Sequence, residues 1–381
     1  MKKSVIIVGG GFAGLELIKR IGNSPRYDTI LVDANNYNFF PPLIYQVSTG
    51  FMEPSAISYP FRKILRNLKN TRFRLGSLIK VVPSENKIIL SNGELHYDIL
   101  VMATGTESSF FGNKNIEKYS LPMKTISDAL TLRNTILTRL DRATRQDDQE
   151  ERKRLLTFVI AGAGPTGVEL SGILAEMKSS IIKKDYPELK ESDLGKIYLI
   201  DGQNTVLNTM SKNSQNYTHA KLIELGVEIK LNCLVKDFKD DIVLLSNGSK
   251  IESKNLIWAA GVTAKAFDGF SPDSFGKGKR LKTNTFNLVK GYDNVYALGD
   301  CALVLGDNEY PEGHPQLAQP AIQQAKNLAI NLEKDQGLWT PFAYKNKGSL
   351  AIIGRNKAVF DLPKEKYFIK GFIAWLIWIL V

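Results

Sequence analysis

Two glycine-rich segments share the spacing Gly-x-Gly-x-x-Gly, at residues 9–14 and 162–167. Each follows a short apolar run, residues 5–8 and 157–161, and each precedes a segment with the apolar periodicity of a helix. Glycines at these positions let the backbone approach a pyrophosphate, and the free N–H groups and positive dipole end of the helix stabilise its charge. The two motifs therefore predict two dinucleotide sites on two similar domains.

An aspartate ends the next strand-like run in each domain. Asp33 follows residues 30–32, and Asp201 follows residues 197–200. A carboxylate at this place accepts hydrogen bonds from the ribose of a bound dinucleotide. Asp201 lies farther from its glycines than the usual spacing of about 20 residues, and a loop in the polar stretch 183–196 would account for the extra length. The alternative is that Asp201 only caps a strand.

The residues after Asp201 bear on the choice of nucleotide. They are Gly202, Gln203 and Asn204, with no arginine to meet a 2′-phosphate, which favours NADH over NADPH. Two dinucleotide sites in one chain indicate electron transfer, with FAD held noncovalently in the first domain and NADH exchanging in the second. A strand-like run ending at Asp300 supports this prediction, since Asp300 would bind the ribityl chain of the flavin. The chain would then return to the first domain after residue 285.

Composition excludes several other kinds of protein. With 43% hydrophobic and 23% charged residues, the 381-residue chain is neither disordered nor of low complexity. Its two cysteines, Cys233 and Cys301, are too far apart for a disulfide scaffold or a C-x-x-C redox pair. The three histidines do not have the spacing of a metal site, so no metal is expected. A net charge of +11 favours an anionic partner.

The two domains are expected to be copies of one plan. Residues 88–90 and 242–245 each precede a Ser-Asn-Gly turn, which predicts equivalent hairpins. A helix is expected over residues 127–144, with Ser127 as its N-cap, followed by a solvated charged run at 145–154. The expected fold class is α/β, with two Rossmann-like domains, the first of them discontinuous, and a small C-terminal membrane-association segment. The expected boundaries are 1–115 with 285–342 for the FAD domain, 116–284 for the NADH domain and 343–381 for the C-terminal segment.

The chain resembles the flavoprotein reductases with two dinucleotide-binding domains. Among them it is most similar to the type II NADH:quinone oxidoreductases, single-subunit NADH dehydrogenases that do not pump protons. The matching stretches cover nearly the whole chain and are residues 9–14, 38–47, 103–106, 162–170, 258–262, 298–302, 318–324 and 347–357. Disulfide reductases and sulfide:quinone reductases of this fold need cysteines near the flavin that Cys233 and Cys301 do not supply.

The motifs and the resemblance together assign the cofactor-binding residues. Those expected to hold FAD are Gly9, Gly11, Phe12, Ala13, Gly14, Asp33, Ala103, Thr104, Gly105, Asp300, Ala318 and Gln319. Those expected to hold NADH are Gly162, Gly164, Thr166, Gly167, Glu169, Asp201 and Gly261.

The resemblance also implies catalytic roles for Glu169, Gln319, Gln323 and Lys347. Glu169 would serve quinone or proton handling, because quinone reduction consumes two protons; the alternative is an acid that only favours the dipole in the first helical turn. Gln319 and Gln323 would border the quinone pocket, or lie on an ordinary amphipathic helix that Pro320 opens. Lys347 would line the pocket, or be a solvated or lipid-facing lysine.

Two further features concern the flavin. The free N–H groups of the helix that Pro320 opens would stabilise the anionic reduced flavin if they point at its pyrimidine edge. Tyr45 and Gln46 follow a Pro-Pro turn, and either pack in the core or lie at the flavin face or the quinone pocket.

Residues 343–381 combine basic side chains with an apolar end that contains tryptophan. As a helix, residues 367–381 would reach about 22 Å, short of a hydrocarbon core of about 30 Å. We therefore expect the segment to lie along a membrane surface, with Trp375 and Trp378 on one face. The basic residues expected to meet anionic headgroups are Lys364, Lys366 and Lys370. The alternative is a core helix. Because members of the family continue beyond this point, we expect the chain to be truncated.

These features predict a peripheral NADH:quinone oxidoreductase on the cytoplasmic face of the cell membrane. It would pass a hydride from NADH to FAD, and then two electrons and two protons to a quinone. One alternative is a soluble FAD-dependent NADH reductase of a protein acceptor such as ferredoxin or rubredoxin. Another is an FAD-binding redox sensor without enzymatic activity. Nucleic acid is not an expected partner, and a homodimer is left open.

Overall fold

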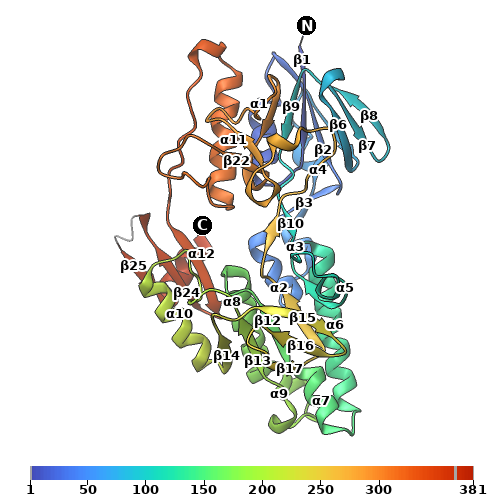
Figure 1. The fold of residues 1–381 in the computed structure, drawn as a ribbon, viewed down its shortest axis with the longest axis vertical. Helices are drawn as coiled ribbons and strands as arrows, with labels where there is room; N and C mark the ends of the chain where they lie inside the picture. The colour runs from blue at the N-terminus through green and yellow to red at the C-terminus, as the bar shows by residue number, and fades with distance from the viewer. Residues whose placement is uncertain (1, 364–366, 381) are drawn as a thin grey trace. The chain divides into compact units, whose positions relative to one another are not determined.

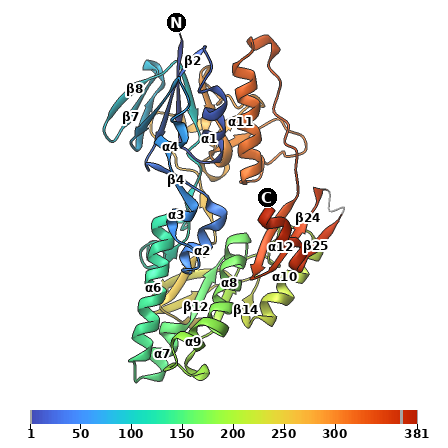
Figure 2. The ribbon, with the colours of Figure 1, turned by 180° about the vertical axis from the view of Figure 1, so that it is seen from behind.

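The computed structural model describes residues 2–363 and 367–380, and the chain forms two compact units (Figures 1 and 2). The first unit comprises residues 1–39, 58–107 and 262–346, and the second comprises residues 40–57, 108–261 and 347–381. The first unit is discontinuous, as expected. The chain re-enters it at Val262, earlier than expected, because Ala264, Phe270 and Leu281 pack into its core. Residues 347–380 belong to the second unit and do not form a segment of their own.

A five-stranded parallel sheet forms the centre of the first unit. Its strands, in order, are β21 (Val295–Ala297), β9 (Ile99–Met102), β1 (Lys3–Val8), β2 (Tyr27–Asp33) and β5 (Thr71–Leu75). The helices of this unit are α1 (Phe12–Ile21), α4 (Phe61–Leu65) and α11 (Ala318–Leu332). Its smaller sheets are β6 (Leu78–Val82), β7 (Lys87–Leu90) and β8 (Gly93–His96); β3 (Tyr37–Phe39) with β4 (Ser58–Pro60); and β20 (Leu281–Thr283) with β22 (Ala302–Val304).

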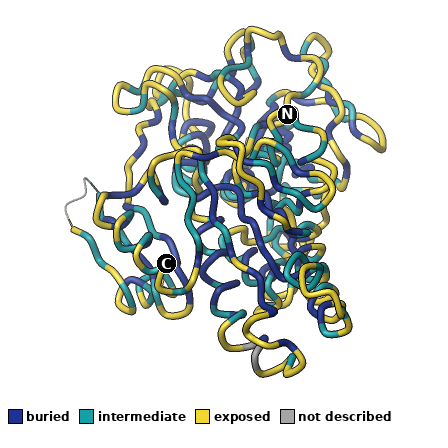
Figure 3. The backbone as a smooth tube through the Cα atoms, turned by 60° about the horizontal axis from the view of Figure 1, so that its bottom comes forward, coloured by how far each residue is buried: buried dark blue, intermediate teal, exposed yellow. Residues whose placement is uncertain are grey.

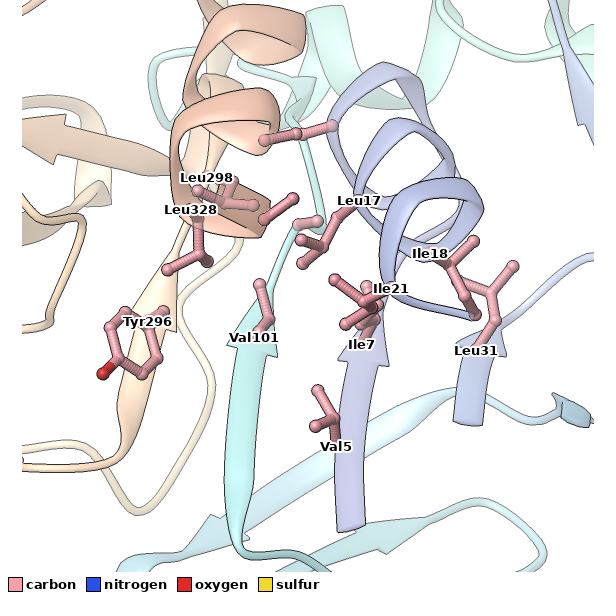
Figure 4. Close-up of a cluster of buried hydrophobic side chains, with 14 of the residues drawn as sticks. Val5, Ile7, Leu17, Ile18, Ile21, Leu31, Val101, Tyr296, Leu298 and Leu328 are labelled. Atoms are coloured by element: carbon pink, nitrogen blue, oxygen red, sulfur yellow. The ribbon is translucent and has the colours of Figure 1, made fainter. Parts of the chain in front are cut away.

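Alternation along β1 builds a core on each face of this sheet. Val5 and Ile7 point toward α1 and α11, where they pack with Leu17 and Leu328 (Figure 4). Ile6 and Val8 belong to the opposite core, which includes residues of β6 and β7. The apolar run at residues 5–8 is thus buried on both sides, as is typical of a central parallel strand.

The second unit repeats this plan. Its parallel sheet has the order β11 (Leu121–Pro122), β18 (Asn255–Trp258), β12 (Phe158–Ala161), β13 (Ile197–Ile200) and β14 (Val227–Lys230). An antiparallel sheet of β15 (Val235–Lys239), β16 (Ile242–Leu245) and β17 (Lys250–Glu252) corresponds to β6–β8. The hairpins predicted at residues 88–90 and 242–245 are therefore confirmed. Figure 3 shows that buried residues lie in the interior of the chain and that exposed residues lie mainly at its periphery.

The helices of the second unit differ in detail from the expectation. They are α2 (Ile44–Ser48), α3 (Pro54–Ile57), α5 (Lys114–Tyr119), α6 (Ile126–Thr144), α7 (Gln149–Leu156), α8 (Pro165–Glu176), α9 (Lys183–Asp185), α10 (Lys212–Glu224) and α12 (Gly371–Leu380). The N-cap of α6 is Thr125, not Ser127, because Thr125 and Asp128 form a reciprocal capping box. Residues 149–154 of the charged run form most of α7 and are exposed or half-buried, and the leucines that this helix buries, Leu155 and Leu156, follow the run.

The C-terminal residues form a small sheet, β23 (Ser349–Gly354), β24 (Lys357–Asp361) and β25 (Phe368–Lys370), with α12 against β24 (Figure 2). A Cβ on Gly172 would lie 1.7 Å from the carbonyl oxygen of Ile353, so the absence of a side chain lets α8 approach β23. The buried Asp361 accepts hydrogen bonds of 2.7 Å from the hydroxyls of Ser211 and Ser214 at the start of α10. These contacts make the C-terminal sheet part of the second unit.

The expected fifteen-residue helix at 367–381 is shorter, because residues 368–370 pair with β24 as a strand. Lys364 and Lys366, expected at the headgroups, lie outside the described residues. Over the described parts of the chain, no helix combines the length and apolar character needed to cross a membrane.

Candidate functional site

The first glycine loop joins β1 to α1. A Cβ on Gly9 would lie 2.3 Å from the carbonyl oxygen of Ala103, and a Cβ on Gly14 would lie 1.9 Å from that of Gly9. Both positions therefore exclude a side chain. A Cβ on Gly11 would meet nothing within 4 Å, so the backbone faces open space there. This space at the start of α1 fits a pyrophosphate.

The second loop, between β12 and α8, has the same geometry. A Cβ on Gly162 would lie 2.4 Å from the carbonyl oxygen of Ala259, and one on Gly167 would lie 1.8 Å from that of Gly162. Gly164, like Gly11, faces open space. The structure thus contains the same cradle twice, once in each unit.

The two predicted ribose acids are held in matching ways. Asp33 accepts hydrogen bonds from the backbone N–H groups of Gly10, at 2.7 Å, and Asn35, at 2.8 Å. Asp201 accepts from Ala163, at 2.6 Å, and Gln203, at 2.8 Å. Each carboxylate thus lies at its glycine loop, and the longer spacing before Asp201 leaves its position unchanged. Burial raises the pKa of Asp33 despite these hydrogen bonds.

A cavity of about 460 Å³ opens beside the second loop. Its wall includes the expected Gly162 and Asp201. The lining residues that sequence reasoning missed include Phe110, Phe111, Cys233, Leu234, Lys236 and Trp258. Apart from Trp258, which begins the matching stretch 258–262, these residues follow no motif, and only the fold brings them to Asp201. Lys236 contributes a cation to the wall of the cavity that also contains Asp201, although no arginine follows Asp201.

The turn that precedes the predicted Asp300 lies where β21 ends, beside the predicted Ala13. Gly299 has φ 69°, and a Cβ on it would lie 3.5 Å from the Cβ of Ala13 and 3.2 Å from that of Ala321. Its N–H donates to the buried Gln324 at 2.6 Å, a contact that the sequence did not predict. The turn at Asp300 therefore lies between the N-termini of α1 and α11. This is the carboxyl end of a parallel sheet, where nucleotides bind in such folds.

The four predicted quinone residues are divided between the two units, with Gln319 and Gln323 in the first and Glu169 and Lys347 in the second. Helix α11 begins at Ala318, so Pro320 is its third residue. Gln319 accepts a hydrogen bond from the Tyr344 hydroxyl at 3.4 Å. Gln323 donates to the carbonyl of Lys345 at 2.9 Å and accepts from its N–H at 3.0 Å, so its amide holds the segment beside α11. Lys347 is exposed and belongs to the second unit.

A second cavity of the second unit, of about 420 Å³, contains Glu169. The other lining residues are Tyr45, Gln46, Phe51, Ile173, Glu176, Ile352, Gly354, Arg355, Asn356 and Trp375. The sequence had singled out Tyr45 and Gln46 as candidates and had assigned Trp375 to the membrane face. Glu169, Ile173 and Glu176 are spaced by three or four residues along α8, and this helical spacing could have indicated that they line one cavity.

Glu169 lies in the second turn of α8, because the helix begins at Pro165. The expectation of a first-turn acid is therefore wrong, since the dipole acts mainly within the first turn. Burial raises the pKa of Glu169 to about 8, and outweighs a hydrogen bond with the backbone of Ile352 that lowers it. A carboxyl with this pKa is mostly protonated at pH 7 and can donate a proton.

Two further side chains that line this cavity, Tyr45 and Glu176, are buried or half-buried and form hydrogen bonds. Tyr45 is buried, which raises the pKa of its phenol, and its oxygen accepts a hydrogen bond of 3.0 Å from the side chain of Gln46. Glu176 accepts from the backbone N–H of Arg355 at 2.7 Å, while burial raises its pKa. The cavity thus combines apolar walls with proton-bearing side chains, an arrangement suited to an apolar molecule that takes up protons.

Comparison with known proteins gives consistent relatives. The family model of pyridine nucleotide-disulphide oxidoreductases matches residues 3–325. The chain is 34% identical to the type II NADH:quinone oxidoreductase Ndh of Mycobacterium tuberculosis over 99% of its own length and 83% of the relative's. It is 29% identical to a probable NADH dehydrogenase of Dictyostelium discoideum, over 99% and 84% of the two chains.

Solved structures share the fold. NDH2 from Plasmodium falciparum in complex with NADH superposes with a TM-score of 0.89 at 23% identity, covering 100% of this chain and 94% of that one. A sulfide:quinone oxidoreductase from Aquifex aeolicus gives a TM-score of 0.78 at 19% identity, with 98% and 88% covered.

Proposed function

The chain belongs to the pyridine nucleotide-disulphide oxidoreductases and, within them, to the type II NADH:quinone oxidoreductases, and we propose that it carries electrons from NADH through FAD to a quinone without pumping protons. The observation that carries this proposal is the chemistry of two separate cavities among those of the second unit. One lies at a glycine loop and its aspartate, and the other surrounds the raised-pKa carboxyl of Glu169. A nucleotide fits the first, and an apolar acceptor of protons fits the second.

The first unit would hold FAD. The open space at Gly11 would take the pyrophosphate, Asp33 the ribose, and Asp300 the ribityl chain. The N-terminus of α11 offers N–H groups near the same edge of the sheet. When bound, FAD supplies the chemistry that connects a two-electron hydride donor with a quinone.

The second unit would bind NADH in the cavity at Gly162 and Asp201. The open space at Gly164 would take its pyrophosphate, and Asp201 would accept hydrogen bonds from the adenosine ribose. Gly261 leaves room for the ring of Phe111 at the cavity, since a Cβ there would lie 2.6 Å from that ring.

The cavity at Glu169 would receive the quinone head. Conversion of a quinone to a quinol adds two electrons and two protons. Glu169 would hold one of these protons at its carboxyl, and the apolar side chains of Phe51, Ile173 and Trp375 would limit the access of water. The carboxyl would then regain a proton from solvent.

Membrane attachment would use α12. Its exposed apolar side chains fall on one helical face and are Phe372, Ile373, Leu376, Ile379 and Leu380. The two tryptophans expected on this face, Trp375 and Trp378, are only partly exposed, and Trp375 lines the Glu169 cavity. An apolar face of this kind fits the boundary of a lipid bilayer, here the inner face of the cell membrane. A homodimer stays an expectation, to be tested by light scattering.

Anaerobic stopped-flow spectroscopy tests the proposed function. The FAD-loaded protein should lose its flavin absorbance on mixing with NADH and recover it on a second mixing with a quinone. A ferredoxin in place of the quinone should restore the absorbance far more slowly. Reduction by NADH without reoxidation by any quinone would contradict the assignment of the acceptor.

A further inference from the structure

The backbone of Phe111 has φ 50° although the residue is neither glycine nor asparagine. A bulky residue rarely adopts this left-handed conformation. Its side chain is 73% exposed, so burial of the ring does not offset the strain. Residues with strained backbone conformations are concentrated at active sites and ligand-binding sites.

The ring of Phe111 packs against an aromatic neighbour at the nucleotide cavity. Phe111 lines this cavity and lies edge-on to Trp258, with the ring centroids 6.3 Å apart. The indole N–H of Trp258 donates to the carbonyl of Ser109 at 2.7 Å, which fixes the aromatic neighbour. The absence of a side chain at Gly261 leaves space for the ring, since a Cβ there would lie 2.6 Å from its Cζ.

A second exposed apolar residue lines the same cavity. Leu234 is 53% exposed, and its side chain lies where a Cβ on Gly202 would be, 2.5 Å from the Leu234 Cδ2 atom. Its loop is fixed to the end of β13, because Cys233 donates its N–H to the carbonyl of Asp201 at 2.9 Å. Asp201 would bind the adenosine ribose, so the base attached to that ribose would lie in this cavity.

We propose that Phe111 and Leu234 hold the adenine ring of NADH between them, and that nucleotide contact offsets the backbone strain at Phe111. The inference rests on the proposed function, because it names the residues that select the adenosine half of the substrate. An aromatic ring stacks favourably on a planar base, and exposed apolar side chains at a cavity mark a ligand surface.

The test compares Phe111→Asn with Phe111→Tyr in the FAD-loaded protein. Asparagine suits a positive φ but removes the ring, whereas tyrosine keeps the ring. Calorimetric titration with ADP-ribose, which lacks nicotinamide, should show a dissociation constant about tenfold higher for Phe111→Asn and unchanged for Phe111→Tyr. Without nucleotide, Phe111→Asn should melt about 2 °C higher than the wild type, because the strain is relieved. KM for NADH should rise while kcat is retained.

Two leucine variants keep the test decisive if Phe111→Asn fails to fold. Leu234→Ala should also weaken ADP-ribose binding several-fold. Leu338→Ala, at a leucine that is 66% exposed in the first unit, should leave it unchanged. The inference would be overturned if Phe111→Asn and Leu234→Ala bound ADP-ribose with wild-type affinity. It would also be overturned if these variants bound nicotinamide mononucleotide more weakly than the wild type but bound ADP-ribose normally. Failure of the wild type to bind either NADH or ADP-ribose would instead overturn the proposed function.

Discussion

At the scale of single residues, Glu169 is the side chain whose protonation state depends most on its surroundings. Its carboxyl forms a hydrogen bond with the backbone of Ile352, which favours ionisation, but burial favours the neutral form and dominates. The resulting pKa of about 8 places a proton on Glu169 at neutral pH, next to the buried phenol of Tyr45. Two consequences can be measured separately.

The first consequence concerns turnover. Glu169→Gln should leave flavin reduction by NADH nearly unchanged and slow reoxidation by quinone by about 10²-fold, in the range of one general acid. In the wild type, reoxidation should slow as the pH rises through 8, and the variant should lack this dependence. Stopped-flow traces from pH 6 to 9 provide the measurement. Equal rates for both half-reactions in the two proteins would show that Glu169 has no part in quinone chemistry.

The second consequence concerns stability. The folded pKa of about 8 lies above the value of 4.5 for an unperturbed glutamate, so the folded chain holds a proton that the unfolded chain releases in this window. Raising the pH from 4.5 to 8 therefore lowers the free energy of unfolding. Glu169→Gln should match the wild type near pH 5 and melt at a higher temperature above pH 8. The exposed Glu188→Gln, as control, should show no such difference across the series of thermal scans.

Asp201 makes a further prediction at this scale. Its carboxylate would meet the 2′-phosphate of NADPH, so kcat/KM should favour NADH by at least about tenfold, or ~1.4 kcal/mol. Asp201→Asn should reduce the preference for NADH over NADPH, because the carboxylate is removed and the cation of Lys236 in the same cavity would attract the 2′-phosphate. Asp33→Asn, the matching change in the first unit, should reduce FAD content without altering the ratio. Steady-state kinetics with both nucleotides decide, and equal efficiency in the wild type would refute the role of Asp201.

At the scale of elements, the two glycine loops separate folding from binding. Gly14 and Gly167 permit the close crossing of a helix start and a strand end, whereas Gly11 and Gly164 face open space. The same motif thus contains glycines of two kinds, which substitution by alanine can distinguish.

Gly164→Ala should fold with nearly wild-type stability but raise KM for NADH at least tenfold, because the methyl group would occupy the space of the pyrophosphate. Gly167→Ala should destabilise the second unit by several kcal/mol, since its Cβ would lie 1.8 Å from the carbonyl oxygen of Gly162. Thermal unfolding and NADH kinetics on the two variants measure the contrast. A stable Gly167→Ala protein would mean that the loop has more room than the structure gives it.

At the scale of the whole molecule, the C-terminal residues combine structure with attachment. A chain cut after Leu362 would lose β25 and α12, which complete the sheet against α8, so truncation would damage the fold as well as the surface. Substitution of the exposed face of α12 is the sharper experiment. Ala374 on the opposite face is fully buried and should be left intact.

The variant Phe372→Ser, Ile373→Ser, Leu376→Ser and Ile379→Ser should lose most of its flotation with anionic liposomes, because it lacks the apolar face that would enter the bilayer boundary. Its turnover with a water-soluble quinone should be retained. The control is Leu75→Ser with Ile79→Ser, which removes exposed apolar side chains from the first unit. Undiminished flotation of the α12 variant would place the anchor elsewhere.

The sequence alone determined the parts of this protein that depend on local chemistry. Glycine spacing, apolar runs and the acids Asp33 and Asp201 predicted two similar α/β units, because loops of this kind work through contacts near in sequence. The family resemblance predicted the oxidoreductase reaction and its cofactors, which the relatives support.

Only the tertiary structure decided which distant residues share a cavity. Residues 40–57 and 347–380 join the second unit, which brings Tyr45 and Trp375 to Glu169 and removes enough water to raise its pKa. The tertiary structure also decides that the amide of Gln323 forms a hydrogen bond with the backbone of Lys345. In α12, the two tryptophans lie away from the most exposed face of the helix. Burial and long-range contact are properties of the packed chain, and no local pattern of residues specifies them.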